Sequence, residues 1–239
     1  MIQASIEQLL FIDIETVSSH HKFTELNEEL QGLFAKKTAY QRKEEFSAEE
    51  FYNEKAGIWA EFGKVVCISI GYIKENGEDR IMRFKSYYGE DEKQLLAEFA
   101  VALKKFSTFK LVGHNVKEFD IPFLCRRMLI HGIELPYSLN VAGKKPWEVQ
   151  HLDTMELWKF GDWKHFTSLK LLTNLFNIPS PKDDIDGSEV GRVFWEEGNC
   201  ERIAIYCEKD ILAVAQLILR WMNKPLLEKE QIHFSILNQ

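Results

Sequence analysis

The chain has 239 residues, of which 45% are hydrophobic and 28% are charged, so it can bury one sizeable core but holds at most two small domains. Its formal net charge of −7 excludes a general attraction to polyanions, so a nucleic-acid partner must be held by local basic groups or bound cations. The four cysteines form no CxxC pair, and the sequence shows neither a signal peptide nor an apolar run of membrane-spanning length. We therefore expect a cytoplasmic enzyme or binding protein without a membrane partner.

The first predicted element is a buried strand at Leu9–Ile14, a short segment rich in leucine, isoleucine and phenylalanine. A polar stretch follows from Ser18 to about Lys55, and large apolar side chains recur in it at helical spacing. We therefore expect amphipathic helices over residues 18–63, inserted between the first strand and the second.

Beyond this insertion, short apolar segments alternate with amphipathic ones. We expect further strands at Val65–Ile73, Arg80–Phe84, Lys110–Gly113 and His151–Thr154. We expect helices at Asp91–Phe106, Phe119–Ile130 and Ser168–Phe176, and a long last helix from an Asn199 cap to about Met222. This order predicts an α/β fold in which helices flank a mixed sheet, as a single domain over residues 1–239 with a C-terminal tail at 223–239.

Two carboxylates stand two residues apart around the end of the first predicted strand, at Asp13 and Glu15. Side chains two apart point to the same side of a strand, so both acids are aimed together from an apolar run. Ionised carboxylates are costly to bury unless they are paired or bind a metal, which indicates a metal site. The alternative is that the strand ends at Ile12 and leaves both acids in water.

Two more candidate features follow, and each has an ordinary structural explanation. Asp120 ends the sequence HNVKEFD and enters a helix, where an acid also complements the helix dipole. In the last helix, Tyr206 and Asp210 are four residues apart and therefore share one face. Taken alone, this pair also fits an exposed acid beside an amphipathic tyrosine at the edge of the core.

Together, the three features resemble the motifs of the DEDD exonuclease superfamily, in its tyrosine-bearing branch. They match Asp-x-Glu at Asp13–Glu15, Asn-x3-Phe-Asp at Asn115–Asp120 and Tyr-x3-Asp at Tyr206–Asp210. The histidine-bearing branch has a histidine five residues before the last aspartate, and this chain has Ile205 there. Each motif is short, but the three occur in order over nearly the whole chain.

More narrowly, the chain resembles the exonuclease domain of family-B DNA polymerases and, in particular, stand-alone bacterial proteins described as predicted 3′→5′ exonucleases. The segments that carry this likeness are FIDIET, FGKVVCISIGY, LVGHNVKEFDIPFL, SPKDDIDGSEV and IAIYCEKD. The resemblance implies a ribonuclease-H-like fold. No segment long enough for a polymerase domain follows Met222, so we expect a stand-alone enzyme. Residues 18–63 are longer than a minimal exonuclease domain requires.

The resemblance also implies a mechanism, in which Asp13, Glu15, Asp120 and Asp210 hold two divalent cations and Tyr206 orients the attacking water. Ligands made only of carboxylate oxygens favour Mg²⁺ or Mn²⁺ over zinc. Two such ions, about 3.5–4 Å apart, stabilise the attacking and leaving oxygens when a phosphodiester is hydrolysed. Four clustered carboxylates repel one another without metal, and bound cations reverse the local charge toward a polyanion.

The expected substrate is the 3′ end of a single strand, contacted by Thr16, Asn115 and Phe119. Phe119 is explained equally well as ordinary core. The loop Lys144–Trp147 combines basic and aromatic residues, which suits backbone contact and base stacking, although a solvated turn explains it too. The segment Lys182–Asp184 is either a border of the site or a charged surface loop.

Three functions are compatible with these residues, and the first is a metal-dependent 3′→5′ exonuclease acting on single-stranded DNA. An RNA-trimming exonuclease would use the same active site, because recognition of the 2′-hydroxyl depends on details of the pocket. The third is a nucleic-acid-binding or scaffold protein with an idle site. Four retained acids count against it, because an idle site has no use for groups that are costly to bury.

Overall fold

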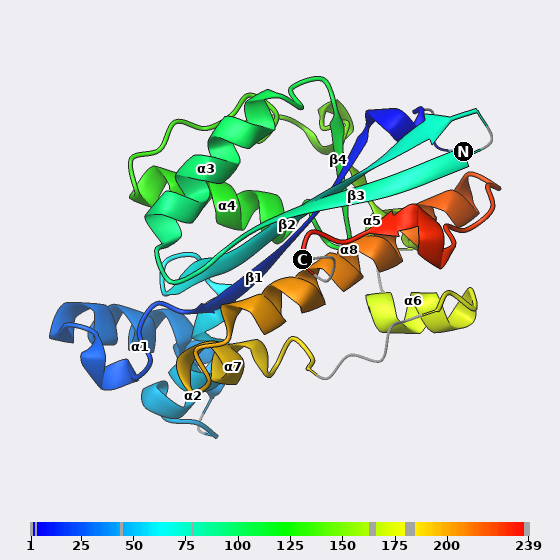
Figure 1. Ribbon diagram of the computed structural model, residues 1–239. Helices are drawn as coiled ribbons and strands as arrows, with labels where there is room; N and C mark the ends of the chain where they lie inside the picture. The colour runs from blue at the N-terminus through cyan, green and yellow to red at the C-terminus, as the bar shows by residue number, and fades with distance from the viewer. Residues whose placement is uncertain are drawn as a thin grey trace.

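The computed structural model describes residues 2, 4–43, 45–77, 79–162, 166–179 and 185–236. Over these residues the chain forms a six-stranded mixed sheet with helices on both faces (Figure 1). The strands are β1 Leu9–Ser18, β2 Gly63–Asn76, β3 Asp79–Tyr88, β4 Lys110–Gly113, β5 Leu152–Asp153 and β6 Ile232–His233. The helices are α1 Glu28–Arg42, α2 Ala48–Lys55, α3 Glu92–Lys104, α4 Asp120–Ile130, α5 Thr154–Lys159, α6 Leu169–Leu175, α7 Val190–Trp195 and α8 Cys200–Trp221. The predicted mixed sheet flanked by helices is confirmed. None of the described helices is long and apolar enough to cross a lipid bilayer.

The sheet has the strand order β5-β4-β1-β2-β3-β6. β1, β2 and β3 form an antiparallel meander, whereas β4 pairs parallel with β1, β5 with β4, and β6 with β3. The first strand is longer than the predicted Leu9–Ile14, because its pairing with β2 continues to Ser18 opposite Gly63. This rules out a strand that ends at Ile12 and keeps the following acids within the sheet.

The two faces of β1 pack against different helices, as the two-residue period of a strand requires. The even-numbered residues of Leu10–Ile14 join the core formed with α3 and α4, whereas Leu9 and Phe11 join the core formed with α8. Figure 1 shows α3 and α4 on one side of the sheet and α8 on the other. Asp13 and Glu15 continue the odd-numbered set, so their side chains are directed toward the α8 layer.

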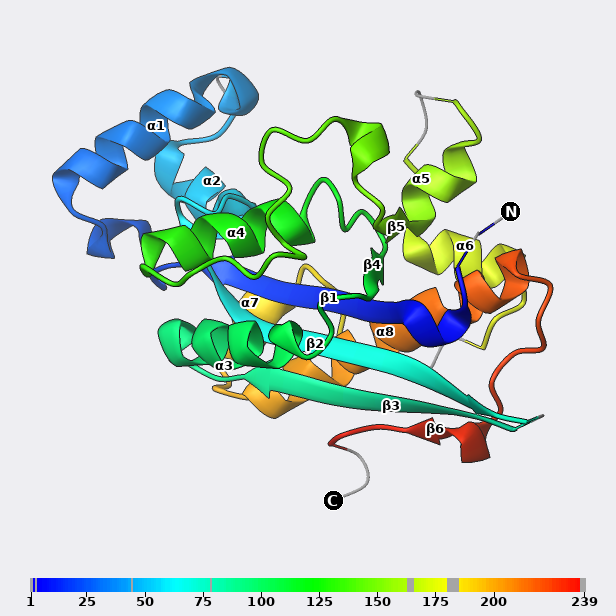
Figure 2. The same ribbon diagram turned by 90° about the horizontal axis from the view of Figure 1, so that it is seen from above.

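The predicted helical insertion between β1 and β2 contains α1, α2 and a short 3-10 helix at Ala56–Ile58. Asn27 and Ser47 cap α1 and α2 by accepting hydrogen bonds from backbone N–H groups of the first turn. Phe34 and Tyr52 are fully buried, and their ring centroids lie 5.2 Å apart, so the insertion has an aromatic core of its own. Figures 1 and 2 place α1 and α2 at one end of the sheet.

A buried ion pair ties the α3–α4 layer to this insertion. Arg127 on α4 donates to Glu92 on α3 from Nε at 2.8 Å and from Nη2 at 2.5 Å, and its Nη1 donates to the Ala60 carbonyl at 2.8 Å. Glu92 also accepts the backbone N–H of Val65 at 2.7 Å and contacts His131 Nε2 at 2.7 Å. Burial alone would raise the pKa of Glu92, but the hydrogen bonds outweigh burial and lower that pKa.

A second buried carboxylate, Glu208 on α8, joins this helix to the far edge of the sheet. Glu208 is fully buried, and its Oε1 accepts a hydrogen bond from Ser86 on β3 at 2.6 Å. Ser235 donates to the same carboxylate through its backbone N–H, at 3.1 Å, and through its hydroxyl. One buried carboxyl group therefore links α8, β3 and the segment that follows β6.

Candidate active site

Asp13 and Glu15 lie on β1 opposite Ser69 and Cys67 of β2. The register shifts immediately after Glu15, at an irregularity before Thr16, and such a bulge re-aims the side chains beside it. Glu15 is 9% exposed and Asp13 is partly buried. The prediction that the two acids share one strand and point to one side of it is therefore confirmed.

Helix α8 packs on that side of the sheet and brings the third motif to the two acids. The thiol of Cys207 donates to the Asp13 carbonyl oxygen at 3.4 Å and to Asp13 Oδ2 at 3.3 Å. Tyr206 hydrogen-bonds Asp210 one turn further along, as their spacing predicts. Asp210 in turn acts electrostatically on both Asp13 and Glu15, so three of the predicted acids interact.

Asp120 approaches β1 from a different direction, at the first turn of α4. Its Oδ1 accepts the backbone N–H of Ile14 at 3.2 Å, and only 3% of the residue is exposed. β4 pairs with β1 only as far as Phe11, so the carboxylate satisfies a backbone group that lies beyond this ladder. A Cβ on Gly113, where β4 ends, would lie 2.9 Å from the Ile12 carbonyl oxygen, so glycine permits the close approach.

Burial and mutual repulsion raise the pKa values of these acids. Burial first, and then the charges of Asp120 and Asp210, raise the pKa of Asp13 well above its ordinary value. Burial and then the charge of Asp13 do the same for Glu15, and burial raises the pKa of Asp120 to about 7. Burial, followed by the charge of Asp210, also raises the pKa of Tyr206, so its hydroxyl is neutral at neutral pH. Acids held in this way gain stability from a positive charge between them.

The donor atoms of the site suit a divalent cation. A carboxylate oxygen of Asp13, one of Glu15 and the sulfur of Cys207 lie within 4.8 Å of one another. Carboxylate oxygens fit Mg²⁺ or Mn²⁺. Burial, followed by a hydrogen bond with Cys67, raises the pKa of the Cys207 thiol, which therefore donates to Asp13. Sequence reasoning missed Cys207, and the signal for it is its position directly after Tyr206 in the third motif.

A cleft of about 830 Å³ opens beside Glu15, and we call it the Glu15 cleft. Its lining comes from β1, from the insertion and from α7, and the insertion was not predicted to take part in the site. Thr16 Oγ1 donates to the carbonyl of Gly57 at 2.8 Å, which fixes the insertion to the strand at this point. The segment Lys182–Asp184, a possible border by sequence, lies outside the described residues.

Two of the three predicted substrate contacts, Thr16 and Phe119, line the Glu15 cleft. Phe119 also packs on the ring of Phe123, with 5.6 Å between centroids, so it belongs to the core and to the cleft at once. The Tyr206 hydroxyl reaches the same wall, because a Cβ on Gly187 of that wall would lie 3.9 Å from it. The cleft therefore joins the first and second motifs, and the third motif borders it.

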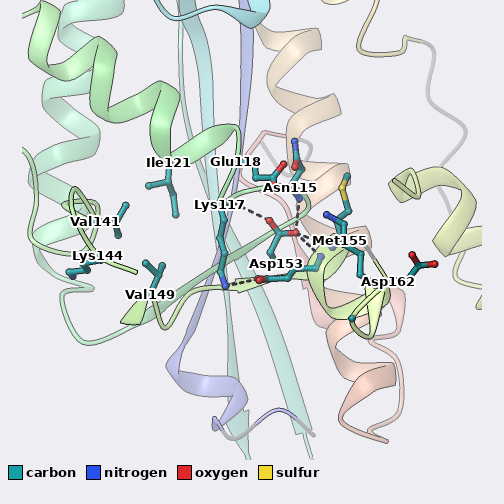
Figure 3. Close-up of a pocket in the computed structure, with 13 residues that line it drawn as sticks. Asn115, Lys117, Glu118, Ile121, Val141, Lys144, Val149, Asp153, Met155 and Asp162 are labelled. Carbon is teal, nitrogen blue, oxygen red and sulfur yellow. Dashed lines mark hydrogen bonds and ion pairs between the residues drawn. The ribbon is translucent and has the colours of Figure 1, made fainter. Parts of the chain in front are cut away.

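The third predicted contact, Asn115, lines a neighbouring hollow of about 530 Å³, which we call the Asn115 pocket (Figure 3). Asn115 has a φ of 65°, a left-handed conformation that asparagine tolerates. Its N–H donates to Asp153 Oδ1 at 2.9 Å, and the N–H of Lys117 donates to Asp153 Oδ2 at 3.1 Å. Asp153 Oδ1 also accepts the N–H of Met155, in the first turn of α5, at 2.9 Å. The buried Asp153 therefore fixes the backbone of the second motif and caps the N-terminus of α5.

The raised pKa of Asp120 predicts how the stability of the metal-free protein depends on pH. The folded state favours the protonated acid, because the pKa is about 7 in the fold and 3.8 ordinarily. The stabilisation is therefore complete below about pH 3.8 and is lost as the pH rises through about 7. We expect the Tm in EDTA to fall between about pH 5 and about pH 8, and Mn²⁺ to raise it most at the upper end. A Tm that rises over this range would contradict the assignment.

Comparison with known proteins gives this arrangement a family context. A family described as "predicted 3′-5′ exonuclease related to the exonuclease domain of PolB" matches residues 58–232, a range that contains the second and third motifs. The DNA polymerase of Pyrococcus glycovorans is 26% identical over 192 residues, which cover 72% of this chain and 24% of the polymerase. The DNA polymerase of Thermococcus litoralis is 22% identical over 191 residues, covering 72% of this chain and 11% of that protein.

A solved structure shows the same fold. The family B DNA polymerase from the hyperthermophilic archaeon Pyrobaculum calidifontis aligns with a TM-score of 0.57 and 15% identity, covering 90% of this chain and 24% of that one. The ribonuclease-H-like fold class and the relation to the polymerase-B exonuclease domain are therefore confirmed. The chain spans about a quarter or less of the length of the polymerases that it matches.

Proposed function

The chain belongs to the family of predicted 3′→5′ exonucleases related to the exonuclease domain of PolB, and from this premise we propose that it removes nucleotides from the 3′ end of single-stranded DNA. The observation that carries the proposal is the meeting of three distant segments at β1. Asp13 and Glu15 come from the strand, Asp210 from α8 and Asp120 from α4. The proposed cofactors are two Mg²⁺ or Mn²⁺ ions held by these four acids.

In the proposed mechanism, each acid has a distinct place. Asp13, which interacts with the charges of both Asp120 and Asp210, would help to hold both ions, whereas Glu15 and Asp210 would hold the ion that activates the attacking water. Asp120 would hold the second ion, while its Oδ1 stays bound to the Ile14 N–H at 3.2 Å. When bound, the ions supply an activated water and shield the charge that develops on the scissile phosphate. The thiol of Cys207 fixes the orientation of Asp13 by its hydrogen bond.

Tyr206 is proposed to orient the attacking water. Its hydroxyl is neutral, borders the Glu15 cleft at Gly187 and is held by Asp210. We therefore expect Tyr206→Phe to keep the Tm and the metal affinity of the wild type and to lower kcat by about ten- to a hundredfold. Thermal unfolding, calorimetric Mn²⁺ titration and steady-state cleavage measure these three quantities, with Tyr72→Phe as the matched control. An unchanged kcat would remove Tyr206 from the mechanism.

The Glu15 cleft is the proposed seat of the terminal nucleotide. Lys22 and Lys55 line it and offer positive charge to phosphates, although the protein as a whole is acidic, and Arg192 lines it while paired with Glu189 and Glu197. Thr16 and Phe119 lie on the same lining, where a hydroxyl and an aromatic ring can contact the sugar and the base. The insertion contributes one wall of the cleft beside Glu15.

The direction of cleavage tests the proposal directly. A single strand labelled at its 3′ end should release labelled mononucleotide from the first turnovers with Mn²⁺, whereas a 5′-labelled strand should shorten stepwise. Asp210→Ala and wild-type protein in EDTA are the inactive controls. Faster degradation of a matched RNA strand would favour the RNA-trimming alternative. Strand binding without any released nucleotide would favour the idle binding protein.

A further inference from the structure

The Asn115 pocket is not used by the terminal nucleotide in the proposed mechanism, and its lining suggests a ligand of its own. Its floor contains the apolar side chains of Ile121, Val141, Val149 and Met155. Figure 3 shows Val141, Lys144 and Val149 on one side of the hollow and Met155 and Asp162 on the other, with Lys117 between them. An apolar floor with amino groups around it suits a flat ring that carries a phosphate.

Three large aromatic rings are exposed and each is accompanied by a lysine, and two of these lysines line the pocket. Tyr137 is 81%, Trp147 77% and Phe166 70% exposed. The Lys144 ammonium group lies 5.4 Å from the ring centroid of Tyr137. The distance is 5.3 Å between Lys145 and Trp147, and 4.6 Å between Lys159 and Phe166. Lys144 and Lys159 also line the pocket, so the rings of Tyr137 and Phe166 are joined to its edge, and Trp147 follows Lys144 by three residues. We call the three rings the aromatic rim.

Rings of this kind bind the bases of a single strand. Any base can stack on an aromatic face, so this contact does not depend on the sequence of the strand. A neighbouring ammonium group attracts the phosphate that follows the base. Two of the four acids of the pocket have partners described here, because Glu156 pairs with Lys117 at 2.6 Å and Asp153 accepts backbone N–H groups, while Glu118 and Asp162 also belong to the lining. Within the described part of the chain, Lys144, Lys145 and Lys159 contact aromatic rings and form no ion pair, so their positive charges can attract a polyanion.

The pocket and the Glu15 cleft lie on the two sides of the second motif. Phe119 lines the cleft, whereas Asn115, Lys117 and Ile121 line the pocket. Asp153 holds the backbone of this short segment through Asn115 and Lys117. A strand whose 3′ end lies in the cleft therefore reaches the pocket by crossing a single fixed loop.

We propose that the Asn115 pocket and its aromatic rim hold the single strand upstream of the nucleotide being removed. This inference rests on the proposed exonuclease function and assigns that function a second, length-dependent binding surface. It also gives a physical reason for single-strand specificity, because the paired bases of a duplex cannot stack on the rim.

The experiment compares a long and a short substrate. The triple variant Tyr137→Ala, Trp147→Ala, Phe166→Ala should bind a strand of about 12 nucleotides at least about tenfold more weakly than the wild type, measured by fluorescence anisotropy with Ca²⁺. Its KM for a strand of about three nucleotides, which fits the cleft alone, should be unchanged. Tyr40→Ala removes another exposed ring, on α1, and serves as the matched control; its affinity should equal that of the wild type. In the single variant Trp147→Phe, the aromatic face is kept and most of the affinity should be kept with it.

The outcomes separate the two proposals. Wild-type affinity of the triple variant for the long strand, or an equal loss on the short one, would overturn the aromatic rim. Failure of the wild type to hydrolyse either strand would overturn the exonuclease function, while the anisotropy comparison would still show whether the rim binds the long one. The rings are exposed, so an unchanged Tm of the triple variant confirms that only the surface was altered.

Discussion

Replacing Asp13 with asparagine is expected to abolish strand cleavage and, in EDTA, to raise the Tm. Burial and the charges of Asp120 and Asp210 raise the pKa of Asp13. An amide of the same shape removes this repulsion and also removes a ligand common to both proposed ions. We expect kcat to fall at least about a thousandfold. The Tm of the variant in EDTA should exceed that of the wild type, and Mn²⁺ should no longer raise it.

Thermal unfolding with and without Mn²⁺, together with a cleavage assay, measures these effects. Asp79→Asn is the matched control, because this aspartate is exposed at the start of β3. It should leave cleavage and the Mn²⁺ response unchanged. An Asp13→Asn variant that unfolds under conditions where the wild type is stable would show that Asp13 serves the fold instead of catalysis.

Replacing Arg127 with alanine is expected to give the largest loss of stability, about 3–5 kcal/mol in the free energy of unfolding. The substitution removes both hydrogen bonds from the guanidinium group to the buried carboxylate of Glu92. It also removes the hydrogen bond from that group to the Ala60 carbonyl. An unpaired buried charge costs far more than the net contribution of the pair, because both ions were already removed from water.

Urea unfolding of Arg127→Ala and of Arg126→Ala measures this cost against a neighbour on the same helix that is exposed. Replacing both members of the pair, as Glu92→Met with Arg127→Met, should recover part of the loss, since no buried charge remains. The recovery is incomplete because the Val65 N–H and the Ala60 carbonyl lose their partners. Equal stability of the two arginine variants would contradict the buried-pair argument.

The parts of the fold that follow local rules were readable from the sequence. The two-residue period of a strand places Asp13 and Glu15 on one face, and the four-residue spacing of a helix joins Tyr206 to Asp210. The start of α8 after Asn199 and its end near Met222 also followed from a cap and from periodicity. Strand ends were less certain, because β1 extends to Ser18 only through its pairing with β2.

What the sequence did not reveal depends on contacts between distant segments. The insertion forms a wall of the Glu15 cleft because Gly57 meets Thr16, 41 residues away. Asn115 lies in a second pocket because Asp153 holds its backbone in a left-handed turn. The basic and aromatic loop at Lys144–Trp147 fitted a solvated turn as well as a stacking surface, and the exposure of its tryptophan, together with the place of Lys144 in the pocket lining, favours the second.

The buried carboxyl group of Glu208 has a consequence for local unfolding. Glu208 lies two residues before Asp210, and its carboxyl group accepts hydrogen bonds from Ser86 and Ser235. Separation of residues 232–236 from the sheet would remove the hydrogen bonds of Ser235 from this buried carboxyl group, and the loss would destabilise the turn of α8 that carries the third motif. Fraying at this edge and disorder at the reaction centre are therefore one cooperative event, visible as matched amide-exchange rates at both places.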